Sequence, residues 1–209
     1  MGIRGIPGER IRPVRMASGE IVLRLPEWMR GMWSDLDVPL DTVEERMRFV
    51  IGLARKNLDH KTGGPFGAAV FEIESGRILG AGVNLVEASH CSIAHAEMMA
   101  IGLAQQATGR YDLGGHGMPA AELVTSTEPC AMCLGAIPWS GVRRVICGAR
   151  GEDACAIGFD EGAKPVDWTE ALRQRGIDVV LDVRREEARA VLQQYERMGG
   201  AIYNAGQGR

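Results

Sequence analysis

The chain has 209 residues, of which 45% are hydrophobic and 24% are charged, a balance typical of a globular domain rather than a disordered chain. A net charge of −3 and an isoelectric point of about 5.9 argue against a broad basic surface, so we do not expect nucleic acid as a partner. No apolar run has the length of a membrane helix or a signal peptide, and five cysteines, an odd number, favour reduced thiols; we therefore expect a cytoplasmic protein.

Residues 1–40 differ in composition from the rest of the chain. Glycine and proline recur in this segment, and its apolar runs are short. Trp28 and Trp33 indicate that part of it packs against the protein. We therefore predict an N-terminal extension over residues 1–40 and a single domain over residues 41–209.

The first regular elements of the domain are a helix and a β-hairpin. Thr42 and Glu45 form a capping-box pattern, and apolar residues recur at helical spacing as far as Leu58. A Gly-Gly-Pro sequence then interrupts the pattern. Residues 66–73 and 77–86 predict two strands that are joined by a tight turn.

Strands and helices alternate over the remainder of the chain. Because strands joined through helices lie parallel while hairpin strands are antiparallel, we expect an α/β fold with a five-stranded mixed sheet and helices on both faces. The remaining predicted elements are strands at 123–126, 142–147 and 177–183 and helices at 94–107, 129–138, 168–175 and 186–198.

Two short segments carry residues with metal-binding chemistry. The first is a His-Ala-Glu sequence that begins at His95, and the second is a Pro-Cys-Ala-Met-Cys sequence that begins at Pro129. One imidazole and two thiols supply three ligands of a tetrahedral zinc ion, which is the number that a catalytic site uses when its fourth position stays open to water. The predicted Zn²⁺ ligands are therefore His95, Cys130 and Cys133, and Glu97 is left as the proton carrier beside that water.

The predicted elements bring these ligands to the starts of two helices. Thiols at a helix N-terminus feel the positive end of the dipole, and Cys130 and Cys133 can point to one side of the first turn. Residues two apart, such as His95 and Glu97, do not share a face of a regular helix, so the spacing alone does not bring both to the metal. The residues leave two alternatives open: a redox pair, or a structural zinc site with a fourth ligand from among Cys91, His90 and Cys155.

The two segments together are the signature of zinc-dependent nucleobase deaminases, and from residue 43 to 205 the chain resembles the cytidine-deaminase-like superfamily. Within it, the chain is most similar to the bacterial guanine deaminases of that fold. The resemblance implies a three-layer α/β/α sandwich around a five-stranded mixed sheet. It is carried by residues 63–69, 84, 94–97, 127–137 with 139, and 156–161.

The resemblance also implies roles for residues outside the metal motif. In guanine-type deaminases an acidic residue at the position of Glu161 faces the amidine edge of the purine and can share in proton transfer; read by itself, Glu161 would be a solvated loop charge. Residues that match Asn84 and Phe66 hydrogen-bond to the base and stack on it. The backbone of the residue that matches Ala96 contacts the substrate oxygen. An aromatic residue that matches Trp139 closes the pocket, in some members from a swapped partner.

The activity that the resemblance implies is zinc-dependent deamination of guanine to xanthine and ammonia by a homodimer. Residues 200–205 resemble a subgroup that also accepts aminotriazines such as ammeline, and a segment near Tyr203 is expected to close over the pocket because water must be excluded. The metal motif is common to the superfamily, so a tRNA adenosine deaminase or a guanosine or cytidine deaminase is the alternative. The non-enzymatic alternative is a zinc-stabilised structural domain.

Overall fold

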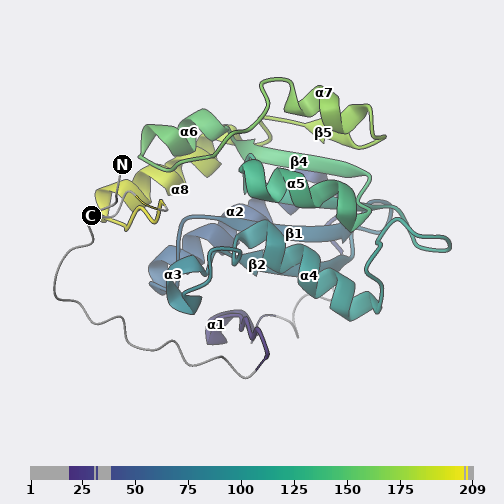
Figure 1. Cartoon of the computed structure of the whole chain (residues 1–209), viewed down its shortest axis with the longest axis horizontal. Helices are drawn as coiled ribbons and strands as arrows, with labels where there is room; N and C mark the ends of the chain where they lie inside the picture. Colours follow the sequence, from purple (N-terminus) through teal and green to yellow (C-terminus); the bar gives the residue numbers. More distant parts are fainter. Residues whose placement is uncertain (1–18, 31, 33–38, 205, 207–209) are drawn as a thin grey trace, which may run out of the picture.

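The computed structural model describes residues 19–30, 32, 39–204 and 206, and a five-stranded sheet lies at its centre (Figure 1). The strands are β1 (Gly67–Glu72), β2 (Ile78–Val83), β3 (Ala121–Thr127), β4 (Arg144–Ala149) and β5 (Asp178–Val180). Their order is β2-β1-β3-β4-β5. Strand β1 is antiparallel to both of its neighbours, while β3, β4 and β5 are parallel to one another. The predicted mixed sheet is therefore confirmed.

Helices cover both faces of the sheet and complete three layers (Figure 1). Those of the described residues are α1 (Glu27–Arg30), α2 (Val43–Asp59), α3 (Val86–Ser89), α4 (Ala96–Thr108), α5 (Ala131–Ser140), α6 (Gly151–Ala156), α7 (Trp168–Arg173) and α8 (Arg185–Arg197). Helices α2 and α8 pack on one face of the sheet, and α4 and α5 lie on the other. The predicted α/β/α sandwich is confirmed.

Alternate residues of the strands belong to two separate cores. Ala69 and Phe71 of β1 join the core beneath α2 and α8, whereas Ala68 and Val70 of the same strand join the core beneath α4. Every residue of β1 is buried. Burial on both faces explains why these strands appear in the sequence as continuous apolar runs rather than as an alternation of polar and apolar residues.

Two helices differ in extent from their predictions. The helix expected over residues 94–107 begins at Ala96, because His95 keeps an extended backbone and serves as the N-cap. Helix α5 continues beyond Pro138, its expected end, to Ser140. A proline near the end of a helix removes one backbone hydrogen bond without preventing the final residues from closing the turn. Helix α2 matches its prediction closely, with the expected capping box at its start.

The region after β4 differs more from its prediction. Strand β5 is shorter than the expected strand over residues 177–183, because the chain turns at Asp182, which has a φ of 64°. Helix α6 was not predicted. Its N-terminal capping contact is local, since Arg150 N donates to Asp153 Oδ2 at 2.8 Å, and the helix is too short to show a periodic apolar pattern.

Part of the predicted N-terminal extension packs against the domain. The indole of Trp28 stacks on His60, with ring centroids 5.4 Å apart, and its Nε1 donates to Thr62 Oγ1 at 3.0 Å. Trp33 and most of residues 1–40 lie outside the described residues. In the described part of the chain, no helix combines the length and the hydropathy needed to span a membrane.

A buried ion pair connects the first helix of the domain to the sheet. Glu122 of β3 is fully buried, and its Oε1 accepts from Arg46 Nη1 of α2 at 2.6 Å. Glu122→Ala is expected to lower the free energy of unfolding by about 3–5 kcal/mol, because the Arg46 charge is left buried without its partner. Urea denaturation measures the change. As a control, Glu72→Ala breaks a pair with the exposed Arg77 and should cost about 1 kcal/mol or less; equal effects would contradict the prediction.

Candidate active site

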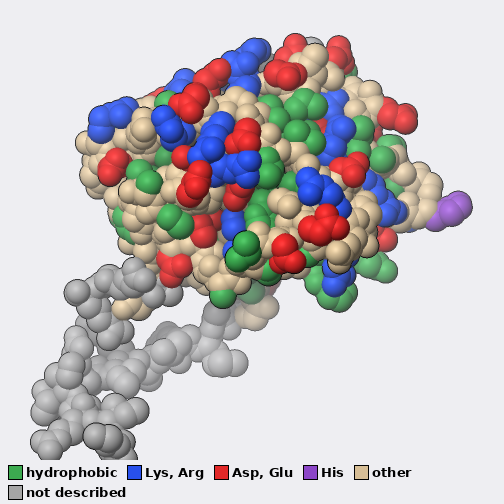
Figure 2. All heavy atoms as spheres, turned by 90° about the horizontal axis from the view of Figure 1, so that it is seen from above, with side chains coloured by type: hydrophobic (Ala, Val, Ile, Leu, Met, Phe, Trp, Pro, Cys, Tyr) green, Lys and Arg blue, Asp and Glu red, His purple; other side chains and the backbone are tan. Residues whose placement is uncertain are grey.

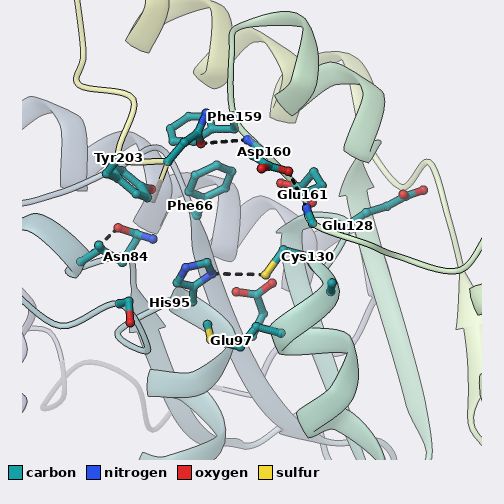
Figure 3. Close-up of a pocket in the computed structure, with 16 residues that line it drawn as sticks. Phe66, Asn84, His95, Glu97, Glu128, Cys130, Phe159, Asp160, Glu161 and Tyr203 are labelled. Carbon is teal, nitrogen blue, oxygen red and sulfur yellow. Dashed lines mark hydrogen bonds between the residues drawn. The ribbon is translucent and has the colours of Figure 1, made fainter. Parts of the chain in front are cut away.

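The three predicted metal ligands lie together at one edge of the sheet, and Figure 3 labels two of them, His95 and Cys130. His95 Nδ1 is 3.5 Å from Cys130 Sγ and 3.6 Å from Cys133 Sγ, and all three ligand atoms lie within 4.8 Å of one another. A tetrahedral zinc ion with bonds of about 2.0 Å to nitrogen and 2.3 Å to sulfur holds these atoms about 3.5 Å apart. The three side chains therefore have the spacing that a zinc ion requires.

Each metal-binding segment supplies the N-cap residue of a helix. His95 and Cys130 have extended backbones immediately before α4 and α5. Because His95 is not part of the helix, the rule that residues two apart point away from each other does not apply to it and Glu97. Gly82 of β2 lets the start of α4 approach the sheet, since a Cβ at that position would lie 2.6 Å from the carbonyl oxygen of Ala96.

The donor set favours an open zinc site over the alternatives. Within the part of the chain that the structure describes, the group of possible ligands at this place contains three residues, and Cys91, His90 and Cys155 are not among them. The pKa of Cys130 is lowered to about 4, because the Cys133 thiol donates to it and His95 lies beside it, although burial opposes the shift. Thiolate is the form that binds metal.

Glu97 lies beside the metal ligands at the base of the pocket (Figure 3). It comes from the first turn of α4 and is 6% exposed. Burial raises the pKa of its carboxyl group, and the neighbouring His95 opposes that rise. A buried carboxyl group with a raised pKa holds a proton more readily than an exposed one, which suits a group that accepts a proton and returns it.

The ligands open into a pocket of about 370 Å³, within the usual range for small-molecule sites. Because β1 is antiparallel to its neighbours, its first end lies at the same edge as the final ends of β2, β3 and β4. Phe66 precedes β1, Asn84 follows β2, and Glu161 comes after β4, so the topology brings all three to this pocket.

Asn84 and Phe66 form one wall of the pocket. The Oδ1 of Asn84 accepts from Val86 N at 3.2 Å, so the amide nitrogen is the group that points toward the cavity (Figure 3). The Asn84 side chain is a fixed hydrogen-bond donor, and the residue is only 1% exposed. The ring of Phe66 meets Phe159 edge to face, with centroids 5.0 Å apart, which holds an apolar surface next to that donor.

Two buried polar atoms in the pocket wall have no hydrogen-bond partner among the described residues: Glu161 Oε2 and the hydroxyl oxygen of Tyr203. Burial is the main reason that the pKa of Glu161 rises to about 8, and Cys130 adds to the effect. A buried polar group without a partner costs about 1–3 kcal/mol. Such groups are expected where a bound ligand completes the hydrogen bonds.

Two of the residues predicted to bind substrate do not line this pocket. Trp139 is 83% exposed and borders a separate apolar groove. It lies in the last turn of α5, about 13 Å along the helix from Cys130, so within one chain it does not close the pocket. Ala96 is fully buried and is not among the residues that line the pocket. Tyr203, near which a covering segment was expected, does line the pocket, as does Phe159, to which no role had been assigned.

The fold and the three-ligand site define a zinc-dependent deaminase, a hydrolase class whose metal activates water. The model of the cytidine and deoxycytidylate deaminase zinc-binding region matches residues 40–149, more than half of the chain. The protein belongs to that family. Zinc is accordingly its metal, and the side chains that fit it are those of His95, Cys130 and Cys133.

Individual relatives narrow the comparison. The chain is 38% identical over 118 residues to the guanine deaminase of Bacillus subtilis, a match that covers 56% of this chain and 71% of that protein. It is 45% identical to NE0047, solved in complex with 2,6-diaminopurine, with a TM-score of 0.82 over 89% of this chain and 97% of the other. The solved guanine deaminase from Nitrosomonas europaea is 43% identical, with a TM-score of 0.81 over 88% of this chain and 100% of the other.

Proposed function

We propose that the protein deaminates guanine, consuming water and releasing xanthine and ammonia. The observation that carries the proposal is the composition of one pocket. The zinc ligands His95 and Cys130 and the buried Glu97 lie at its base. Its walls present an unpartnered carboxyl oxygen of Glu161 and the fixed amide donor of Asn84. An aminopurine offers donors and acceptors on its edges and a flat ring between them. NE0047, whose fold is shared, is described with a diaminopurine bound.

Each side chain has a separate task in this reaction. Zinc, when bound, would act as a Lewis acid and lower the pKa of the reacting water toward neutrality. Glu97 accepts the proton of that water and passes it to the ring nitrogen beside the carbon that loses its amino group. The oxygen of the water bonds to that carbon, and the bond to the amino group breaks. The departing amino group takes a second proton from the added oxygen, which Glu97 carries or Glu161 helps to carry. Asn84 donates to an acceptor on the base, and Phe66 packs against its ring.

Substrate choice is tested by ammonia release from guanine, guanosine, cytosine, cytidine, adenine, ammeline and a tRNA anticodon stem-loop. We expect turnover of guanine, and we propose ammeline as a second substrate because its amidine resembles that of guanine. Turnover of guanosine or cytidine would indicate a nucleoside deaminase. Turnover of the RNA alone would indicate a tRNA adenosine deaminase, and no turnover by the zinc-loaded protein would favour a structural domain.

The charge distribution supports a small-molecule substrate rather than nucleic acid. On the face shown in Figure 2, acidic and basic side chains lie next to one another instead of gathering by sign. Arg184 pairs with Glu187, and Arg185 pairs with Glu152 and Asp153. Basic residues that are neutralised by neighbours contribute little to phosphate binding.

We propose that the protein works as a homodimer in which Trp139 reaches the pocket of the partner. Support comes from the 83% exposure of its indole and from the apolar groove beside it, which Pro138 and Trp168 also border. Light scattering should give twice the mass of one chain. A monomeric Trp139→Ala variant with reduced turnover would support the role, and a fully active monomer would refute it.

We also propose that residues 41–209 form the deaminase domain, with residues 1–40 as an extension, and that the protein is cytoplasmic. The match to the family model begins at residue 40. None of the five cysteines forms a disulfide, and reduced cysteines persist in the cytoplasm.

Glu161→Gln is expected to lower kcat/KM for guanine by about 100-fold or more, because the amide keeps the shape of the side chain but cannot carry a proton or a negative charge. Steady-state ammonia release measures the change. Glu196→Gln, which removes an exposed carboxylate of α8, is the matched control and should behave like the parent. If both variants retain full activity, Glu161 has no part in the reaction.

A further inference from the structure

The chain folds back after α8 and returns to the pocket. The hydroxyl of Tyr195, in α8, donates to the carbonyl oxygen of Ala201 at 2.7 Å. This bond directs residues 199–204, called here the C-terminal segment, across the end of the helix. Tyr203 and Asn204 consequently line the same pocket as His95 and Cys130, although they come much later in the sequence.

Asn204 makes a paired contact with residues 158–162, called here the Glu161 loop. Its Oδ1 accepts a hydrogen bond from Asp160 N at 2.9 Å, and its Nδ2 donates to the carbonyl oxygen of Gly158 at 2.8 Å. One amide side chain therefore binds the loop backbone at two points that are separated by a single residue. Glu161 follows Asp160 directly, so the contact lies one residue from the carboxylate that enters the pocket.

Aromatic rings fill the space between the two segments (Figure 3). Phe159, between the two points that Asn204 binds, lies 5.0 Å from the ring of Tyr203 and 5.0 Å from that of Phe66. The far side of the loop is held separately, because Ala131 N donates to the carbonyl oxygen of Glu161 at 2.9 Å. The start of α5 and the C-terminal segment thus each form hydrogen bonds with the Glu161 loop.

We propose that Asn204 is a positioning residue that joins the C-terminal segment to the Glu161 loop and so sets the placement of Glu161 against the substrate. The inference rests on the proposed function only for its kinetic consequence. The physical coupling of the two segments follows from the hydrogen bonds of Asn204 and stands apart from the identity of the substrate. Displacement of a reacting group by about 1 Å can lower the rate of turnover by about 100-fold.

The test compares Asn204→Ala with Gln193→Ala, a control that removes an exposed amide from α8. In the zinc-loaded protein, Asn204→Ala should raise amide hydrogen exchange in residues 158–162 and 199–204 together, with the melting temperature close to that of the control. With guanine, kcat should fall about 10- to 100-fold and KM should change less than about threefold. In a Glu161→Gln background the same substitution should cost less than about threefold, because both changes act on one group.

Unchanged exchange in residues 158–162 would overturn the proposal, as would a kinetic loss that is equally large with and without Glu161. A loss confined to KM would also overturn it, since it would make Asn204 a binding residue. If the parent protein releases no ammonia from guanine, the proposed function fails. The exchange measurement then still decides whether the two segments are coupled.

Discussion

Glu97→Gln is expected to lower kcat for guanine by about 1,000-fold or more while the protein keeps its fold and its zinc. Glu97 is buried in the first turn of α4, two residues after the N-cap ligand His95. Proton transfer by a positioned side chain typically increases the reaction rate by about 10²- to 10⁴-fold. Glutamine has the same size but cannot move a proton. Steady-state ammonia release gives the rate, and elemental analysis gives the zinc content.

The control for this variant is Glu87→Gln, which removes an exposed carboxylate from α3. It should retain the parental rate. A Glu97→Gln enzyme with a near-parental rate would remove the central assumption of the mechanism. A variant that loses zinc together with activity would instead assign Glu97 a structural part in the metal site.

Cys133→Ser is expected to abolish both zinc retention and turnover. Cys133 is fully buried and lies 3.6 Å from His95 Nδ1, so its replacement leaves two ligands and a hydroxyl that binds zinc far more weakly than thiolate does. The unliganded variant should also melt at a lower temperature, because metal binding adds to the free energy of the folded state. Elemental analysis, ammonia release and calorimetry measure the three effects.

Cys155→Ser is the matched control for the loss of a thiol, since Cys155 is exposed and outside the ligand group. It should retain zinc and activity. Removal of zinc from the parent with a strong chelator should likewise stop turnover, and added zinc should restore it. Full turnover by the chelated parent or by a zinc-free Cys133→Ser variant would show that the reaction does not depend on this metal.

The sheet could be predicted because each strand and each connection has a clear pattern in the local sequence. Apolar strands, a tight hairpin and intervening helices define the mixed α/β architecture, and Thr42 with Glu45 marks the start of α2 as the structure has it. Helix α6 could not be found in this way, because its stability depends on the contact of Asp153 with Arg150 N and on the ion pair of Asp153 with Arg185 of α8, and not on a periodic pattern. The shortness of β5 likewise depends on the left-handed backbone of Asp182.

The metal ligands could be predicted from residue types and spacing, whereas their joint geometry could not. That His95 and Glu97 both reach the site depends on the extended backbone of the N-cap, which spacing does not reveal. Tyr203 and Asn204 reach the pocket through tertiary folding, since Asn204 binds a loop 46 residues earlier at Gly158. The resemblance implies that Trp139 closes the pocket, but within a single chain its indole is exposed and borders a separate groove.

The contacts that hold residues 158–162 have a consequence for the engineering of substrate selectivity. The predicted zinc ligands His95 and Cys130 lie at two helix starts beside the sheet. Part of the pocket rim comes instead from residues 158–162 and 199–204, which contact each other through the amide of Asn204 and the rings of Phe159 and Tyr203. If one of these two segments is replaced by the corresponding segment of a homologue with a different substrate preference, the other segment loses its matching contacts. We therefore expect substrate selectivity to transfer between homologues only when both segments are exchanged together, and chimeras with a single exchange should lose activity.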